Sequence, residues 1–251
     1  MYLHDGQMMF DNSTSPLNKG FFNGGMGWYY GGLFWDVDKT VSKLVYDETI
    51  EPVILVSVWN LPTKRGTEYM PQKMFEGHKR GTGFDGMELK KEVWIESLTS
   101  DKYLRFLVEE IKPYIDTHYR SKVDRANTYI MGSSMGGMIS AYAIAEYPSL
   151  FGGAACLSTH WPAGGDLVTD WYKDNWPKAG NHRIYFDRGT KNLDAQYGRG
   201  HQQMNAIMQE RGFSHGVDWI SKIFEGEGHM ISAWRDRLHI PLEFLLASKN
   251  D

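Results

Sequence analysis

The sequence predicts an α/β protein with a mostly parallel sheet and helices on both of its faces. Short apolar runs rich in β-branched residues alternate along the chain with stretches of helical periodicity, which is the order of elements in such proteins. The 251 residues are 41% hydrophobic, enough for one substantial core. A serine also stands in a glycine-flanked turn between an apolar run and a helical stretch. We therefore expect a single domain over residues 1–251.

Strands and helices follow one another in the order that a parallel sheet requires. Apolar runs predict strands at the start of the chain and at residues 53–58, 129–131, 151–158, 183–187 and 217–224. Helical periodicity predicts helices at residues 35–50, 100–119, 138–147, 197–211 and 230–247. Asp36 or Asp38 should cap the first helix, and Pro113 should bend the second. Residues 60–98 are polar and glycine-rich, and we expect a long functional loop or lid there.

Composition argues against several classes of protein. The net charge of −4 gives no electrostatic reason to expect a nucleic-acid partner. No apolar run approaches the ~18 residues that a membrane span needs, and no signal peptide is recognisable. The single cysteine, Cys156, lies in an apolar run and is interpreted as a core residue.

Residues 132–136, Gly-Ser-Ser-Met-Gly, carry the most specific chemical signal. They fit the pattern Gly-x-Ser-x-Gly between a predicted strand and a predicted helix, which is the setting of a nucleophile elbow. Small residues on both sides of the central serine allow the backbone to make this strained turn. The helix that follows directs its N-terminal dipole at the site and favours negative charge there. Ser134 is therefore the candidate nucleophile.

A serine nucleophile needs a general base and an acid that orients the base. His229 is the favoured base, because it follows the last predicted strand on a glycine-containing turn before the final helix. His160, which follows another strand, is the second candidate base, and it either lines the site or is a loop histidine whose hydrogen bonds are satisfied locally. The acid is expected after strand 183–187. Asp187 ends that strand, and we favour Asp194 in the loop beyond it, from which a carboxylate can reach the imidazole.

An oxyanion intermediate needs two backbone N–H donors. Met135 directly follows the candidate nucleophile and should supply one of them. The second should come from Gln7, in the loop after the first strand, where Gly6 lets the backbone turn inward. The sequence has no His-x-x-x-His motif, no cysteine pair and no phosphate-binding glycine loop. We therefore expect neither a metal site nor a cofactor.

Three segments resemble the putative esterase, or esterase D-like, family of α/β-hydrolases. They are Tyr-Leu-His-Asp-Gly-Gln from residue 2, the elbow, and the Gly-His of residues 228–229 followed by the Trp-Arg of residues 234–235. The family includes feruloyl and acetyl-xylan esterases, siderophore esterases and the antigen 85 mycolyltransferases. The resemblance runs from residue 1 to about residue 246. It implies the α/β-hydrolase fold and ester hydrolysis.

The resemblance also implies roles for individual residues. Ser134 would be the nucleophile, His229 the base and Asp194 the acid, with the amides of Met135 and Gln7 as oxyanion donors.

Four further residues are candidates for substrate contact. Arg65 and Tyr69 resemble a segment that lies near the pocket in siderophore-esterase-like members, and His160 and Trp161 follow a predicted strand. Many other aromatic residues fall in predicted loops, which favours a sugar or aryl substrate.

The start of the chain departs from the family pattern. Family members normally have two or more strands before the one that ends in His-Asp-Gly, and here the chain begins on that strand. Either this is a shortened variant or the start is truncated, so the missing signal peptide says little, and a cytoplasmic location is expected only if the chain is complete. The absent strands would lie beside residues 53–58. We therefore expect an exposed edge strand there, through which the chain could form a homo-oligomer or aggregate.

The leading interpretation is a serine carboxylic-ester hydrolase that works through an acyl-enzyme on a small-molecule ester, with an acylated sugar, an aryl ester or a siderophore-type ester as substrate. An acyltransferase would use the same triad and pass the acyl group to an alcohol. A non-catalytic binding protein on the same fold is the third interpretation.

Overall fold

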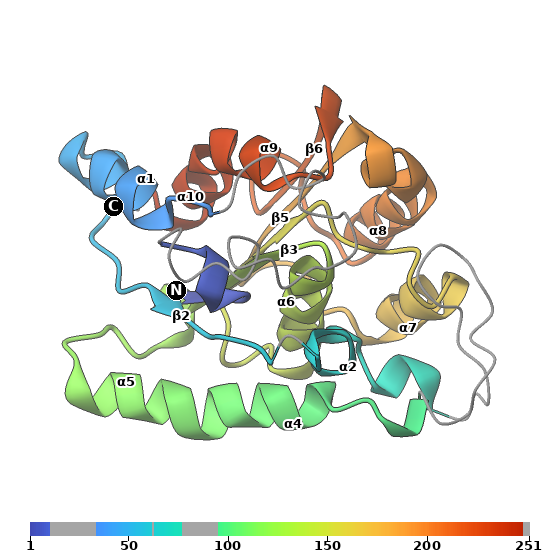
Figure 1. Cartoon of the computed structure of the whole chain (residues 1–251), viewed down its shortest axis with the longest axis horizontal. Coiled ribbons are helices and arrows are strands. Elements are labelled where there is room, and N and C mark those ends of the chain that lie inside the picture. The colour runs from blue at the N-terminus through green and yellow to red at the C-terminus, as the bar shows by residue number, and fades with distance from the viewer. Residues whose placement is uncertain (11–33, 62, 77–94, 248–251) are drawn as a thin grey trace.

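The computed structural model describes residues 1–10, 34–61, 63–76 and 95–247 (Figure 1). Within them, six strands form one parallel sheet in the order β2-β1-β3-β4-β5-β6. The strands are β1 (Tyr2–Leu3), β2 (Val56–Ser57), β3 (Tyr129–Ser133), β4 (Gly153–Leu157), β5 (Arg183–Lys191) and β6 (Trp219–Gly228). The predicted parallel α/β architecture is confirmed.

Helices cover both faces of the sheet. One buried cluster joins the sheet to α1 (Val37–Tyr46), α9 (Ile231–Asp236) and α10 (His239–Leu246). A second cluster joins the opposite face to α2 (Arg65–Tyr69), α4 (Ser100–Arg105), α6 (Met135–Glu146), α7 (Asp166–Asn175) and α8 (Gly198–Glu210). Because both faces are covered, β3 and β4 are buried along their whole length.

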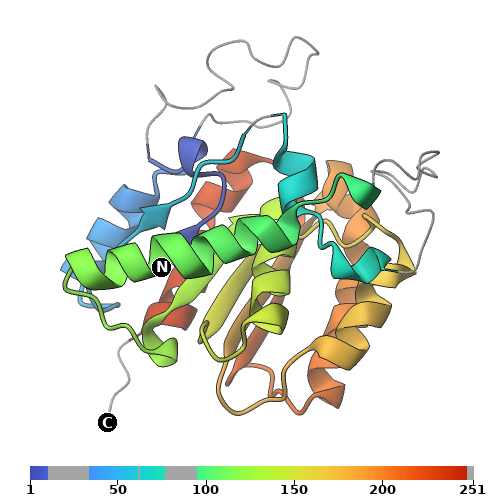
Figure 2. The same cartoon turned by 90° about the horizontal axis from the view of Figure 1, so that it is seen from below.

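The helix expected at residues 100–119 contains a change of helix type. Figure 2 shows α4 and α5 (Lys112–His118) running in line as one long helix. Between them, Phe106–Ile111 is π-helical and ends just before Pro113. Proline lacks an N–H and its ring crowds the carbonyl four residues earlier. The wider π turn accommodates this, so the helix changes its winding before Pro113 while α4 and α5 run in line, and the bend expected at Pro113 is not seen.

Other elements differ from their sequence-based predictions. The helix expected at residues 230–247 is two helices, α9 and α10, and Pro241 lies in the first turn of α10, where its missing N–H costs no helical hydrogen bond. Part of the region 60–98 is helical, in α2 and the 3₁₀ turn Lys73–Phe75, whereas residues 77–94 lie outside the described residues. Asp36 stands at the start of α1 but pairs with Lys39 instead of capping the helix.

The strand expected at residues 53–58 is short and lies at one edge of the described sheet. Only Val56–Ser57 pair with β1, and no described strand flanks them on their other side. The apolar residues just before β2 are partly exposed. Among the helices that the structure describes, none is both long and apolar enough to cross a membrane.

Candidate active site

Ser134 lies at the sharp turn between β3 and α6. Its φ of 58° and ψ of −121° fall outside the regions that ordinary L-residues populate, a strain typical of a nucleophile elbow. The flanking glycines are needed for packing, since a Cβ on Gly132 would lie 2.6 Å from the carbonyl oxygen of Gly136. Ser134 is 9% exposed. The sequence around the serine therefore makes the strand–turn–helix expected of it.

The other candidate residues follow the next strands of the same sheet. His160 comes after β4, Asp194 after β5 and His229 directly after β6. Carboxyl ends of parallel strands meet at one edge of a sheet, which is where α/β proteins form their sites. The fold therefore gathers residues that are up to 95 positions apart in the sequence at the edge that carries Ser134.

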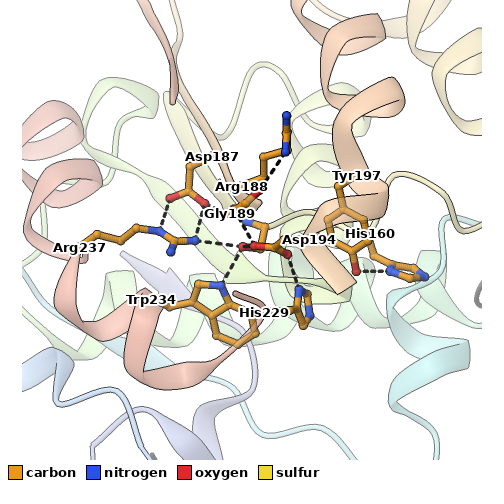
Figure 3. A network of polar contacts seen from close by, with 10 residues as sticks. His160, Asp187, Arg188, Gly189, Asp194, Tyr197, His229, Trp234 and Arg237 are labelled. Atoms are coloured by element: carbon orange, nitrogen blue, oxygen red, sulfur yellow. Dashed lines mark hydrogen bonds and ion pairs between the residues drawn. The ribbon is translucent and has the colours of Figure 1, made fainter. Parts of the chain in front are cut away.

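His229 and Asp194 are in direct contact (Figure 3). Nδ1 of His229 lies 2.7 Å from Oδ1 of Asp194, and the two side chains are 5% and 0% exposed. Oδ2 of Asp194 accepts hydrogen bonds from the Gly189 amide and the Ser158 hydroxyl, each at 2.7 Å. Burial by itself raises the pKa of Asp194, but the hydrogen bonds from His229, Ser158 and Gly189 outweigh it and hold that pKa below its ordinary value.

Asp187, the alternative acid, is engaged by other groups. Arg237 donates from Nε to Oδ2 at 2.9 Å and from Nη2 to Oδ1 at 3.0 Å. The Tyr185 hydroxyl and the Ser158 amide donate to the same carboxylate, both at 2.9 Å. Burial acts to lower the pKa of Arg237, and Asp187 more than offsets this, so that pKa is raised. The contact with the candidate base therefore goes to Asp194.

Ser158 connects these two buried carboxylates, because its amide donates to Asp187 and its hydroxyl donates to Asp194. Its Oγ donates to Asp194 and accepts from Nε1 of Trp234 at 2.9 Å and from Nη2 of Arg237 at 3.0 Å. In the sequence, Trp234 stands out only as part of the Trp-Arg motif, and neither Ser158 nor Arg237 stands out as a candidate. The sequence signal for Ser158 is weak, because it is a polar residue directly after a strand and many loops begin with such a residue.

His160 lies beside the same site. Its backbone N–H donates to the carbonyl of Ser134 at 3.2 Å, and its Nδ1 is 2.5 Å from the Tyr197 hydroxyl. Burial, followed by the charges of His229 and Arg65, lowers the pKa of His160 to about 3. This imidazole is therefore neutral at pH 7, which suits a polar wall of the site.

Trp161 is 1% exposed and packs edge-on against Tyr172 and Phe186, with ring centroids 6.1 and 5.5 Å apart. It belongs to the buried cluster on that face of the sheet. A substrate contact by Trp161 stays a prediction.

The two expected oxyanion donors lie in the first residues after β1 and at the start of α6. Gln7 is in the 3₁₀ turn Gly6–Met8 and is 5% exposed. Met135 is the first residue of α6, and the N–H groups of a first helical turn have no acceptor within the helix. Within the described ranges, no group of three or more His, Cys, Asp or Glu side chains could hold a metal ion.

Arg65 and Tyr69, both in α2, reach the loop that carries Gln7. The Arg65 guanidinium makes two contacts with the Asp5 carboxylate, at 2.6 and 2.8 Å, and the Tyr69 hydroxyl accepts from the Asp5 amide at 2.9 Å. The guanidinium also lies over the Tyr69 ring, 5.3 Å from its centroid. The structure thus brings both residues against the turn next to the candidate oxyanion donor.

Comparison with known proteins gives independent evidence about the family of this chain. Residues 1–239 match the family model described as "Putative esterase". A curated relative, the endo-1,4-beta-xylanase/feruloyl esterase of Xylanibacter ruminicola, is 28% identical over 141 residues, which make up 56% of this chain and 17% of the relative. The chain therefore corresponds to a small part of that relative.

Solved structures of similar fold include an enterobactin esterase and a ferulic acid esterase. The enterobactin esterase FES from Shigella flexneri superposes with a TM-score of 0.61 at 18% identity, over 97% of this chain and 51% of that one. A ferulic acid esterase superposes with a TM-score of 0.56 at 18% identity, over 98% of this chain and 83% of that one. At such low identity the likeness shows the fold, and it confirms the α/β-hydrolase fold that the sequence predicts.

Proposed function

We propose that this chain, which belongs to the putative esterase family, is a carboxylic ester hydrolase that acts through a triad of Ser134, His229 and Asp194. The observation that carries the proposal is the buried 2.7 Å contact between His229 and Asp194, at the sheet edge where Ser134 occupies a strained turn. A carboxylate that holds Nδ1 of an imidazole fixes its tautomer and leaves Nε2 to act as the base.

Each residue has one role in the proposed reaction. Ser134 Oγ attacks the ester carbonyl carbon while His229 takes the hydroxyl proton. Negative charge develops on the carbonyl oxygen and is stabilised by the amides of Met135 and Gln7, together with the N-terminal dipole of α6. His229 then gives its proton to the leaving alkoxide, and the acyl group stays on Ser134.

Water completes the cycle. His229 removes a proton from a water molecule that attacks the acyl-enzyme, and a second oxyanion forms at the same amides. Collapse of this intermediate releases the carboxylic acid and returns the proton to Ser134. Asp194 remains ionised throughout, because its hydrogen bonds hold its pKa below the ordinary value.

An ester with an aromatic acyl group or a sugar is the substrate class that we propose. The named relatives include a feruloyl esterase and an enterobactin esterase, and the rings of Tyr197 and Trp234 lie edge-on to His229, at 5.4 and 4.8 Å between centroids. Both rings are buried, at 0% and 3% exposure, so they hold the imidazole in place, and the substrate class rests on the relatives.

Two measurements test the proposal. A panel of p-nitrophenyl, feruloyl and acetyl-sugar esters should be hydrolysed by the wild type and not by Ser134→Ala. An organophosphonate should label the wild type and Ser133→Ala, whose altered serine is the neighbour in the same motif, but not Ser134→Ala. Labelling that persists in Ser134→Ala would show that Ser134 is not the nucleophile.

The same acyl-enzyme can also transfer its acyl group to an alcohol. Product analysis with a sugar acceptor separates the two outcomes, because hydrolysis yields the free acid whereas transfer yields a new ester. If neither product forms and no phosphonate labelling is seen, the remaining interpretation is a non-catalytic binding protein on this fold.

A further inference from the structure

Asp5 is a buried, charged residue in an uncommon backbone conformation next to the proposed oxyanion loop. It is 1% exposed and has a left-handed φ of 56°, which aspartate tolerates better than most residues. Its carboxylate accepts from Nδ2 of Asn60 at 2.5 Å, from Nε of Arg65 at 2.6 Å and from Nη2 of Arg65 at 2.8 Å. A buried carboxylate with three such donors is strongly held in place.

Asn60 extends this network to the residue whose amide is proposed to bind the oxyanion. The Oδ1 atom of Asn60 accepts from Nε2 of Gln7 at 3.1 Å, while its Nδ2 serves Asp5. The backbone takes part as well, because the Gly6 amide donates to the carbonyl of Val58 at 2.9 Å. The segment that follows β2 therefore holds the Gln7 loop through both side chains and backbone.

The Asp5 carboxylate also lies beside the second proposed donor. A Cβ on Gly136 would be 3.2 Å from Oδ2 of Asp5, so the carboxylate packs against the first turn of α6, next to Met135. Asp5 thus sits between the two segments that carry the oxyanion amides. An uncompensated carboxylate at this place would oppose the negative charge that develops on the substrate oxygen. Arg65 supplies the compensating positive charge.

We propose that Asp5, Asn60 and Arg65 are positioning residues that set the spacing between the Gln7 and Met135 amides, and that Arg65 neutralises Asp5 beside the oxyanion. This inference rests on the proposed function of the site. It assigns Arg65 a role through Asp5, distinct from a contact with the substrate, although its side chain is 29% exposed.

Three variants test this clamp, formed by Asp5, Asn60 and Arg65, with p-nitrophenyl acetate as substrate. Arg65→Met should lower kcat about 10²-fold, the size of effect seen when an oxyanion donor is lost or displaced, and should change KM by less than about threefold. Arg65→Lys should recover part of kcat, because it restores the charge without the two-point geometry. Asp5→Asn combined with Arg65→Met should be less impaired than Arg65→Met alone, since no buried charge is left uncompensated.

Arg199→Met is the matched control, because Arg199 also pairs with an aspartate, Asp166, but on the surface. It should leave kcat unchanged. The rate of phosphonate labelling of Ser134 gives a second readout, since the tetrahedral phosphonate places an oxygen where the oxyanion forms. This rate should fall together with kcat in Arg65→Met, whereas a purely structural role would change the melting temperature and spare the labelling rate of the folded fraction.

The failing outcomes are distinct. Unchanged kcat and labelling in Arg65→Met, or a raised KM with unchanged kcat, would overturn the clamp while a normally labelled wild type kept the proposed function. A wild type that is neither labelled nor active would instead overturn the function itself. If Arg65→Met does not fold, Arg65→Lys decides: a lower kcat with unchanged KM supports the clamp, and an unchanged kcat overturns it.

Discussion

Arg237 binds Asp187 through two hydrogen bonds inside the protein, at 2.9 and 3.0 Å, with the two side chains 5% and 0% exposed. The same guanidinium reaches Ser158, which donates to Asp194. Asp187 does not contact the candidate base His229. Through Arg237 and Ser158 it nevertheless helps to hold Asp194, which does.

Arg237→Met should destabilise the fold by roughly 3–5 kcal/mol, because it leaves a buried carboxylate without its charged partner. Urea unfolding followed by circular dichroism measures the change. The double variant Asp187→Asn with Arg237→Met should be more stable than Arg237→Met alone, since both charges are then removed. Equal stability of the single and double variants would show that the pair is not coupled as its geometry indicates.

Asp194→Asn and Asp187→Asn should separate activity from stability. Asp194→Asn removes the acceptor of the His229 ring and should lower turnover on the order of 10³–10⁴-fold, as loss of the correct imidazole tautomer does. Asp187→Asn should lower turnover far less but leave Arg237 buried and unpaired, so its main cost should be in unfolding free energy. Steady-state kinetics and urea unfolding on both variants check this, and the opposite pattern would exchange the two assignments.

Ser134→Ala and His229→Ala should each remove nearly all esterase activity, and the double variant should be little worse than either single variant. Residues that act as one unit give losses that are far from additive. The measurement is kcat/KM on one p-nitrophenyl ester for all four proteins. Losses that multiply in the double variant would mean that the serine and the histidine act independently.

Ser158→Ala should shift the acid limb of the pH–rate profile to higher pH. Burial raises the pKa of Asp194, and the Ser158 hydroxyl is one of the donors that hold it down, so losing that donor raises the pKa of Asp194. Trp234→Phe keeps the Ser158 donor to Asp194 and should shift the limb less. A limb unmoved in Ser158→Ala would contradict the role given to this hydroxyl.

β2 lies at one edge of the described sheet, and we expect this edge to permit self-association. The amides of Val56 and Val58 bond to the carbonyls of Met1 and Leu3, so the Ser57 amide faces away from β1. Ser57→Pro removes this outward donor, as proline does on natural edge strands, and should lower the mass measured by light scattering relative to Ser57→Ala. A monomeric wild type with strongly protected amides along residues 53–58 would show that this edge is covered.

The elbow could be predicted from the sequence because its determinants are local. The turn at Ser134 needs small residues two positions away on either side, a strand before it and a helix after it, and all of these lie within about 20 consecutive residues. The position of His229 after the last strand is local in the same sense. Parallel strands alternating with helices bring such strand ends to one edge whatever the details of packing.

Which carboxylate contacts His229 and which contacts Arg237 depends on contacts between segments that are far apart in the sequence. Asp187 lies within β5, whereas Asp194 follows it. The irregular pairing of β5 with β6 between Gly189 and Lys191, followed by a 3₁₀ turn, directs the Asp194 carboxylate toward His229. Arg237, which engages Asp187, lies 50 residues further along the chain. No periodicity or motif encodes such a pairing.

The surroundings of the site were likewise decided by tertiary structure. Asn60 and Arg65 meet Asp5 only because β1 and β2 are neighbours in the sheet, which places residues 55 and 60 positions apart in contact. Local sequence determined where the nucleophile and the base stand, since backbone conformation depends on near neighbours. Packing decided which buried charges pair, because a charge removed from water is stabilised only by the opposite charges and hydrogen-bond donors or acceptors that the fold places beside it.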